Sequence, residues 1–160
     1  MLIQKKKLTP EQAAQKIKQF CAYQERCHKE VKDKLYSYGL WKRDVEQLIS
    51  LLIEENYLNE ERFAILFAGG RFRMKQWGRI KIVYELKMKQ VSAYCIKKAM
   101  AAINEDDYKN TLKRLYEKKL ETLDEKNHLL KKRKLTDYLL QKGYEHENIV
   151  ALFTKHEIDP

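Results

Sequence analysis

The sequence predicts an all-α protein, a tandem repeat of three three-helix modules of helix-turn-helix-like form in an elongated, curved array. Prolines occur only at positions 10 and 160, so no residue between them lacks the backbone N–H that a helix needs. Five glycines in 160 residues leave few natural helix breaks, and the helix formers Lys, Leu, Glu, Ala and Gln are abundant. A repeated pattern of apolar residues and turns then divides the chain into modules.

The first helix is expected to begin at Pro10, where three residues form a helix-start signal. Thr9 can cap the helix, Pro10 suits the first helical position, and Gln12 can reach back to the cap as in a capping box. Apolar residues then recur on one helical face, at Ala13, Ile17, Phe20 and Cys21.

Eight further helices are expected from apolar residues at helical spacing. Their positions, helix by helix, are Val31, Leu35 and Tyr38; Val45, Leu48, Ile49, Leu52 and Ile53; Phe63, Leu66, Phe67 and Gly70; Ile82 and Leu86; Ile96, Ala99, Met100 and Ile103; Leu112, Leu115, Leu120 and Leu123; Leu135 and Leu139; and Ile149, Leu152 and Phe153. Asn59, followed by two glutamates, is a cap signal for the fourth helix. Trp77 and Gly78 end that helix, and the polar run 104–107 precedes the seventh.

Three segments repeat one pattern at intervals of about 50 residues. Each has an apolar residue, a Gly or Gln four positions later, another apolar residue directly after it, and then a Val or Ile. The sets are Leu35, Gly39, Leu40 and Val45; Leu86, Gln90, Val91 and Ile96; and Leu139, Gly143, Tyr144 and Ile149.

The spacing of the repeat predicts a helix, a tight turn and a second helix. A left-handed Gly39 would let Leu40 pack back on Leu35, as in a Schellman motif, and forward on Val45. Gln90 replaces the glycine in the middle copy, so its turn is expected to be strained or not left-handed. With a preceding helix, each copy forms a module, and we expect modules at residues 9–57, 58–104 and 105–156.

No enzyme chemistry is visible in the sequence. It has no glycine-rich phosphate loop, dinucleotide fingerprint, zinc-protease motif or nucleophile elbow. Three cysteines without metal-ligand spacing are interpreted as free thiols in a reducing compartment. We therefore expect no catalytic residue, cofactor, metal or small-molecule substrate. No signal segment or membrane-length apolar run occurs, and we expect a cytoplasmic monomer.

Charge is the main functional signal. Lys and Arg number 33 against 23 Asp and Glu, which gives a formal net charge of +10 and favours a polyanionic partner. The candidate binding residues are Arg71, Arg73, Lys75, Trp77, Arg79 and Lys81, and a second run of Lys131, Lys132, Arg133 and Lys134. The alternative for the basic runs is a solvated helix face. Trp77 fits base stacking or, as the preferred interpretation, the core between two helices.

Several short blocks occur in a fixed order along roughly residues 9–153. They are Glu25–Cys27 with Val31, Leu35, Gly39 and Leu40; Leu58–Ala64; Gly78–Ile80 with Glu85, Leu86, Gln90 and Val91; and Leu139 with Lys142–Tyr144 and Ile149. In the order and spacing of these blocks the chain resembles the RecX family of bacterial regulators of the recombinase RecA.

The resemblance implies binding to a RecA filament on DNA and inhibition of its recombination and co-protease activities. Contact with single- or double-stranded DNA would be weak or indirect. One rival is a basic helix-turn-helix-like nucleic-acid-binding protein without a RecA partner. The other is a protein-binding helical scaffold whose charge is incidental.

Overall fold

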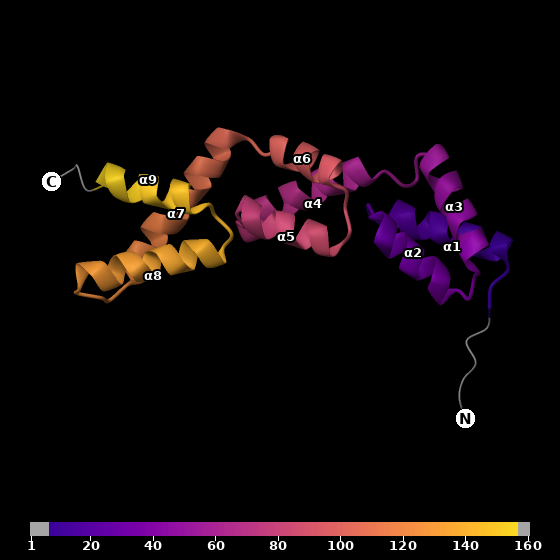
Figure 1. The fold of residues 1–160 in the computed structure, drawn as a ribbon, viewed down its shortest axis with the longest axis horizontal. Helices are drawn as coiled ribbons and strands as arrows, with labels where there is room; N and C mark the ends of the chain where they lie inside the picture. The colour runs from indigo at the N-terminus through magenta and orange to yellow at the C-terminus, as the bar shows by residue number, and fades with distance from the viewer. Residues whose placement is uncertain (1–6, 157–160) are drawn as a thin grey trace, which may run out of the picture. The chain divides into compact units, whose positions relative to one another are not determined.

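A computed structural model of the protein describes residues 7–156, and all regular structure in that range is helical (Figure 1). The helices are α1 (Pro10–Tyr23), α2 (His28–Ser37), α3 (Lys42–Glu54), α4 (Glu60–Lys75), α5 (Arg79–Met88), α6 (Ala93–Ala101), α7 (Glu105–Thr122), α8 (His128–Gln141) and α9 (His146–His156). The predicted all-α repeat of helical modules is confirmed. The elongated, curved shape and the three module boundaries stay predictions.

Two predicted helix starts are confirmed by their hydrogen bonds. In α1, the N–H of Gln12 donates to Thr9 Oγ1 at 3.2 Å, and the N–H of Thr9 donates to Gln12 Oε1 at 3.1 Å. This is the reciprocal capping box that the sequence predicts. In α4, the N–H of Arg62 donates to Asn59 Oδ1 at 2.9 Å, so Asn59 is the cap.

The three repeated turns all place their Gly or Gln in the left-handed region. The φ angles are 85° at Gly39, 58° at Gln90 and 98° at Gly143. At Gln90 both Schellman hydrogen bonds form, because Val91 N–H donates to Leu86 O at 3.1 Å and Gln90 N–H donates to Lys87 O at 2.9 Å. The middle turn is therefore left-handed and strained, at a cost of about 1–2 kcal/mol for a residue with a Cβ.

The chain groups into two compact units. Among the described residues, one unit consists of residues 7–66 together with Leu86–Lys98, and the other consists of Phe67–Glu85 together with residues 99–156.

In the first unit, α1, α2 and α3 pack on one another (Figure 1). Their core consists of Ala13, Ile17, Cys21, Val31, Leu35, Leu40, Val45, Leu48, Leu52 and Leu58. Leu35, Leu40 and Val45 lie in this one cluster, as the repeat predicts.

Ion pairs hold the start of α4 and the end of α5 to this bundle. Arg62 Nε donates to Glu25, and its Nη2 donates to the carbonyl of Asn56 at 3.2 Å. Lys89 Nζ lies 3.4 Å from Glu30 Oε1. These contacts join residues far apart in the sequence, so helical periodicity alone does not predict them.

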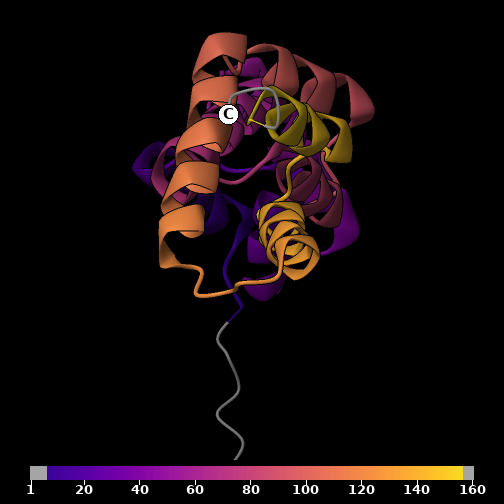
Figure 2. The ribbon, with the colours of Figure 1, turned by 90° about the vertical axis from the view of Figure 1, so that its left-hand side faces the viewer.

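In the second unit, α7, α8 and α9 pack on one another, and Figure 2 shows α7 across from the other two. The largest fully buried side chains of this bundle are Tyr108, Leu135, Leu139, Tyr144 and Ile149. The rings of Tyr116 and Phe153 meet edge to face at 5.5 Å between centroids.

Two apolar residues assigned to helix faces do not lie in the core. Ile53 is 46% exposed because it lies at the margin of the buried face of α3, and Leu66 is 52% exposed because it lies on the side of α4 away from the buried Ala64 and Ala68. Cys21, Cys27 and Cys95 are buried free thiols, as predicted. Among the described helices, none is long and apolar enough to cross a membrane.

Candidate functional site

Trp77 lies half-buried in the link between α4 and α5, with three cations around its ring. The ring centroid lies 4.6 Å from Lys81 Nζ, 5.2 Å from Lys75 Nζ and 5.7 Å from the guanidinium carbon of Arg71. Each distance is within the range for a cation–π contact, which contributes about 0.5–2 kcal/mol. We call Arg71, Lys75, Trp77 and Lys81 the Trp77 cluster. The preferred sequence interpretation places this indole in the core between two helices, whereas the structure leaves it half-buried.

Arg79, another of the predicted binding residues, is engaged inside the fold. Its Nη2 donates to Glu105 Oε1 at 2.7 Å, and its guanidinium stacks on the Tyr108 ring at 3.9 Å. Its backbone N–H donates to the Tyr108 hydroxyl at 3.0 Å. Both the charge and the planar surface of the Arg79 guanidinium are thus engaged within the fold. Arg79 therefore orients the start of α5 against α7.

The link that carries Trp77 is joined by its backbone to the turn between α8 and α9. Gly78 N–H donates to Lys142 O at 2.8 Å, and Ile80 N–H donates to Gly143 O at 2.9 Å. A Cβ on Gly78 would lie 2.3 Å from the carbonyl carbon of Gly143, so the approach requires glycine. We call this contact the Gly78–Gly143 joint.

Lys142 extends the Trp77 cluster because of this joint. Its Nζ lies 3.4 Å from the carbonyl oxygen of Lys75, at the end of α4. The Tyr144 hydroxyl donates to the next carbonyl, that of Gln76, at 2.9 Å. The α8–α9 turn therefore satisfies two carbonyls at the C-terminal end of α4 and brings a fourth cation beside it.

Two buried tyrosines, Tyr108 and Tyr144, lie next to the Gly78–Gly143 joint. The Tyr108 hydroxyl donates to Glu145 at 2.8 Å, and its ring centroid lies 5.1 Å from that of Tyr144. Burial raises the pKa of Tyr108 and of Tyr144 well above the usual range of a phenol. Both hydroxyls therefore stay protonated and act as fixed donors in this part of the unit.

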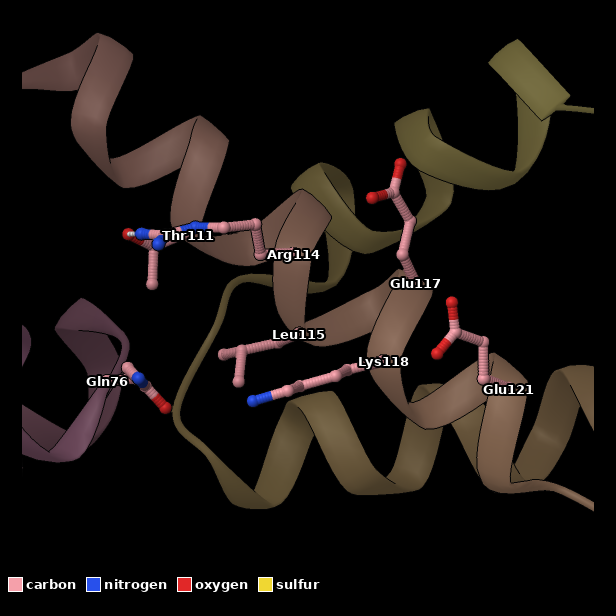
Figure 3. A pocket seen from close by; sticks show the side chains of 7 residues that line it. All are labelled: Gln76, Thr111, Arg114, Leu115, Glu117, Lys118 and Glu121. Carbon is pink, nitrogen blue, oxygen red and sulfur yellow. Dashed lines mark hydrogen bonds between the residues drawn. The ribbon is translucent and has the colours of Figure 1, made fainter.

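Arg73 points elsewhere and lines a groove along α7. Its guanidinium lies against Gly69, where a Cβ would meet Nη1 at 2.7 Å. Two clefts of about 260 and 480 Å³ share Gln76, Thr111 and Arg114, and together they form what we call the α7 groove. In Figure 3, Arg114 and Lys118 extend toward Gln76, while the carboxylates of Glu117 and Glu121 lie farther from it.

The second basic run lies on the N-terminal half of α8. Lys134 Nζ pairs with Glu125 at 3.0 Å, and Lys132 Nζ lies 5.1 Å from the Phe153 ring centroid. Arg133 is exposed, and Lys131 is half-buried. The hydrogen bond from Lys134 holds the Glu125 pKa below its usual range, and the Glu125 carboxylate offsets part of the positive charge of the run.

The structure thus brings Arg71, Lys75 and Lys81 together on Trp77 and separates Arg73 and Arg79 from them. Sequence reasoning missed Lys142 beside the Trp77 cluster, and it missed Arg114 and Lys118 as residues that line the α7 groove. A signal for Lys142 exists, because it directly precedes the repeat glycine Gly143. No local pattern indicates that this turn meets Gly78, since the two glycines are 65 positions apart in the chain.

The fold and these surfaces define the class of the protein, a basic all-α repeat of small helical modules that presents clustered cations. Residues 59–100 match the family model for the second three-helix domain of RecX, and residues 105–152 match that for its third three-helix domain. The chain belongs to the RecX family of regulatory proteins.

Named relatives agree with this assignment. The regulatory protein RecX of Pelodictyon phaeoclathratiforme is 33% identical over 120 residues, which cover 75% of this chain and 73% of the relative. The RecX of Clostridium perfringens strain 13 is 34% identical over 134 residues, 81% of this chain and 62% of the relative. The chain thus spans about three fifths of the length of this Clostridium relative.

A solved structure shares the fold. The crystal structure of RecX from Lactobacillus salivarius superposes with a TM-score of 0.85 at 20% sequence identity. The match covers 93% of this chain and 97% of that one. At this identity the likeness concerns the fold alone.

Proposed function

We propose that this protein binds a RecA recombinase filament on DNA and inhibits its recombination and co-protease activities. Membership of a regulatory family, together with the resemblance to regulators of RecA, carries the proposal. The protein would act as a cytoplasmic monomer without a cofactor. It would bind one filament state more tightly than another and thereby shift the equilibrium between them.

The Trp77 cluster supports an anionic partner. Arg71, Lys75 and Lys81 converge on one indole, and Lys142 lies beside them. A filament on DNA offers two kinds of anion, the phosphates and the acidic side chains of the recombinase. Either kind would be attracted by these charges and would bind less tightly at high salt.

The rival proposal is a nucleic-acid-binding protein that needs no recombinase. The same convergence of cations favours it, because phosphates alone could neutralise them. A gel shift on bare DNA over a salt series, with and without RecA and nucleotide, separates the two. Binding that requires RecA at physiological salt supports the filament proposal, and equal binding without RecA supports the rival.

The decisive functional experiment is inhibition of RecA strand exchange and ATPase activity by charge variants. Arg71→Ala with Arg73→Ala is expected to weaken inhibition and leave the helical spectrum unchanged. Because Arg73 faces the α7 groove, each single variant should be measured as well. Lys109→Gln, an exposed lysine on α7 outside the predicted set, is the matched control.

Unchanged inhibition by the double variant at every salt concentration would contradict the role of this surface. The assignment would then move to Lys131, Lys132, Arg133 and Lys134. A charge-neutral variant of that run, tested in the same assay, would decide between the two surfaces. Failure of the unaltered protein to inhibit RecA at any concentration would contradict the function itself.

A further inference from the structure

Within residues 7–156, the cations of the Trp77 cluster have no acidic partner. Among the ion pairs of the described residues, none involves Arg71, Lys75, Lys81 or Lys142. By contrast, Arg79 in the same stretch of chain pairs with Glu105 at 2.7 Å. Like charges that gather without a counter-charge repel one another, so an anion that joins them relieves a cost already present in the free protein.

The distances to the indole set the spacing of these charges. All three cations lie within 5.7 Å of the Trp77 ring centroid, so any two are at most about 11 Å apart. A single nucleic-acid strand carries one phosphate per 3.4 Å of helix axis, so this span corresponds to about three nucleotides. A lone carboxylate could neutralise only one of the cations.

The cations also occupy the surface that a stacked base would need. A ring has two faces, and three cations already lie within cation–π distance of this one. A base that stacks on Trp77 must first displace at least one of them. The indole therefore orders the cations, and it is a positioning residue rather than a stacking platform.

The Gly78–Gly143 joint fixes the fourth charge relative to the other three. Two backbone hydrogen bonds of 2.8 and 2.9 Å tie Lys142 and Gly143 to the link that holds Trp77. Lys142 Nζ is held near the carbonyl of Lys75 at 3.4 Å. Residues from the α4–α5 link and from the α8–α9 turn thus meet on one surface.

We propose that Arg71, Lys75, Lys81 and Lys142, ordered by Trp77, bind successive phosphates of a nucleic-acid strand without contacting its bases. This site deepens the proposed function by naming the anion that the surface takes. It needs no recombinase, so its test uses bare strands. If this test fails, the protein can still inhibit RecA, so failure of the site and failure of the proposed function are distinguishable.

The test compares the full chain on two labelled single strands of equal length by fluorescence anisotropy over a salt series. One strand is oligothymidine, and the other is an abasic strand with the same phosphates. We expect affinities equal within about twofold, because the phosphates carry the binding. A poly-glutamate peptide of equal charge is the third ligand, and it is expected to bind at least tenfold more weakly.

Variants then assign the site. Lys142→Gln and Lys81→Gln are each expected to lower the magnitude of the salt slope by about 0.7, the value for one single-strand phosphate contact. Trp77→Leu keeps every charge and is expected to weaken binding of both strands by the same factor, about fivefold, because the cations are no longer ordered by the indole. Trp41→Leu, at the other tryptophan and 75% exposed, is the matched control and should change neither affinity.

Three results would overturn the proposal. Tenfold tighter binding of oligothymidine, lost in Trp77→Leu, would show base stacking. Poly-glutamate binding as tight as the abasic strand would identify an acidic protein surface as the ligand. Unchanged salt slopes in both Lys142→Gln and Lys81→Gln, with helical spectra like that of the parent, would show that these cations do not bind phosphates.

Discussion

The backbone of Gly78 lies against the backbone of Gly143, with the Gly78 N–H donating to the preceding carbonyl, that of Lys142, at 2.8 Å. A Cβ added at Gly78 would lie 2.3 Å from the carbonyl of Gly143, and one added at Gly143 would lie 2.3 Å from the Cβ of Lys81. Because real Cβ atoms do not approach so closely, this contact joins two distant segments only when both residues are glycine.

Gly78→Ala is therefore expected to destabilise the protein by about 1–3 kcal/mol, because the backbone must move to admit the new methyl group. The control is Gly70→Ala, on α4, where a Cβ would meet nothing within 4 Å. That change should stabilise by about 0.5–1 kcal/mol, since alanine favours a helix interior. Urea denaturation of both variants measures the difference, and equal midpoints would contradict the close approach.

The repeated turns predict opposite effects for opposite substitutions. Gly143→Val is expected to destabilise by more than about 1 kcal/mol, because φ is 98° and a β-branched residue resists that conformation. Gln90→Gly is expected to stabilise by about 0.5–1 kcal/mol, because Gln90 already adopts a φ of 58°. Thermal melts test both signs. A lower melting temperature for Gln90→Gly would mean that the Gln90 side chain contributes more stability than its left-handed backbone conformation costs.

Arg62 is expected to be important for stability although it lies on a partly exposed surface. It donates to Glu25, whose other carboxylate oxygen is buried and has no hydrogen-bond partner among residues 7–156. Arg62→Ala should therefore cost about 1–3 kcal/mol, because it leaves a desolvated carboxylate. Lys29→Ala is the control, since its 2.8 Å pair with Asp33 is exposed and should contribute less than about 1 kcal/mol. Equal losses in urea denaturation would contradict this ranking.

The buried thiols predict a loss of stability at alkaline pH. Burial raises the pKa of Cys27 from 9.0 to about 11, and its thiol donates to Glu30 at 3.2 Å. Between pH 9 and 11 the unfolded chain releases this proton while the folded chain keeps it, so the free energy of unfolding falls as pH rises. The stabilising contribution is fully present below pH 9.

Cys27→Ala should therefore flatten the decline of unfolding free energy between pH 9 and 11. Denaturant titrations at several pH values in that window measure the slope. Cys21, whose pKa burial also raises to about 11, remains in the variant and leaves a residual decline. A slope identical to that of the parent would show that Cys27 does not titrate differently in the two states.

Much of the helical architecture is predictable from local sequence. The Thr9–Gln12 capping box, the Asn59 cap and the left-handed glycines each depend on residues within one turn of a helix. Apolar spacing also places most core residues correctly, but it misplaces Ile53, at the margin of a buried face, and Leu66, on the side of α4 away from the buried Ala64 and Ala68. Burial there depends on what packs opposite.

The candidate site was only partly predictable. A dense run of basic residues around Trp77 is visible in the sequence, but it does not distinguish Arg79, which pairs with Glu105, from Lys81, which contacts Trp77. Neither the pairing of Arg79 nor the arrival of Lys142 follows from neighbouring residues. Both depend on how α7 and the α8–α9 turn meet the start of α5.

The sequence by itself determined the helices, their caps, the repeated turns and the basic character of the protein. These features follow from backbone preferences and from charge, which act over a few residues or do not depend on position. Only the tertiary structure decided which cations have no acidic partner in the described part of the chain and which ones gather on one indole. That outcome depends on Gly78 meeting Gly143, a contact between distant segments made by two residues that carry no side chain.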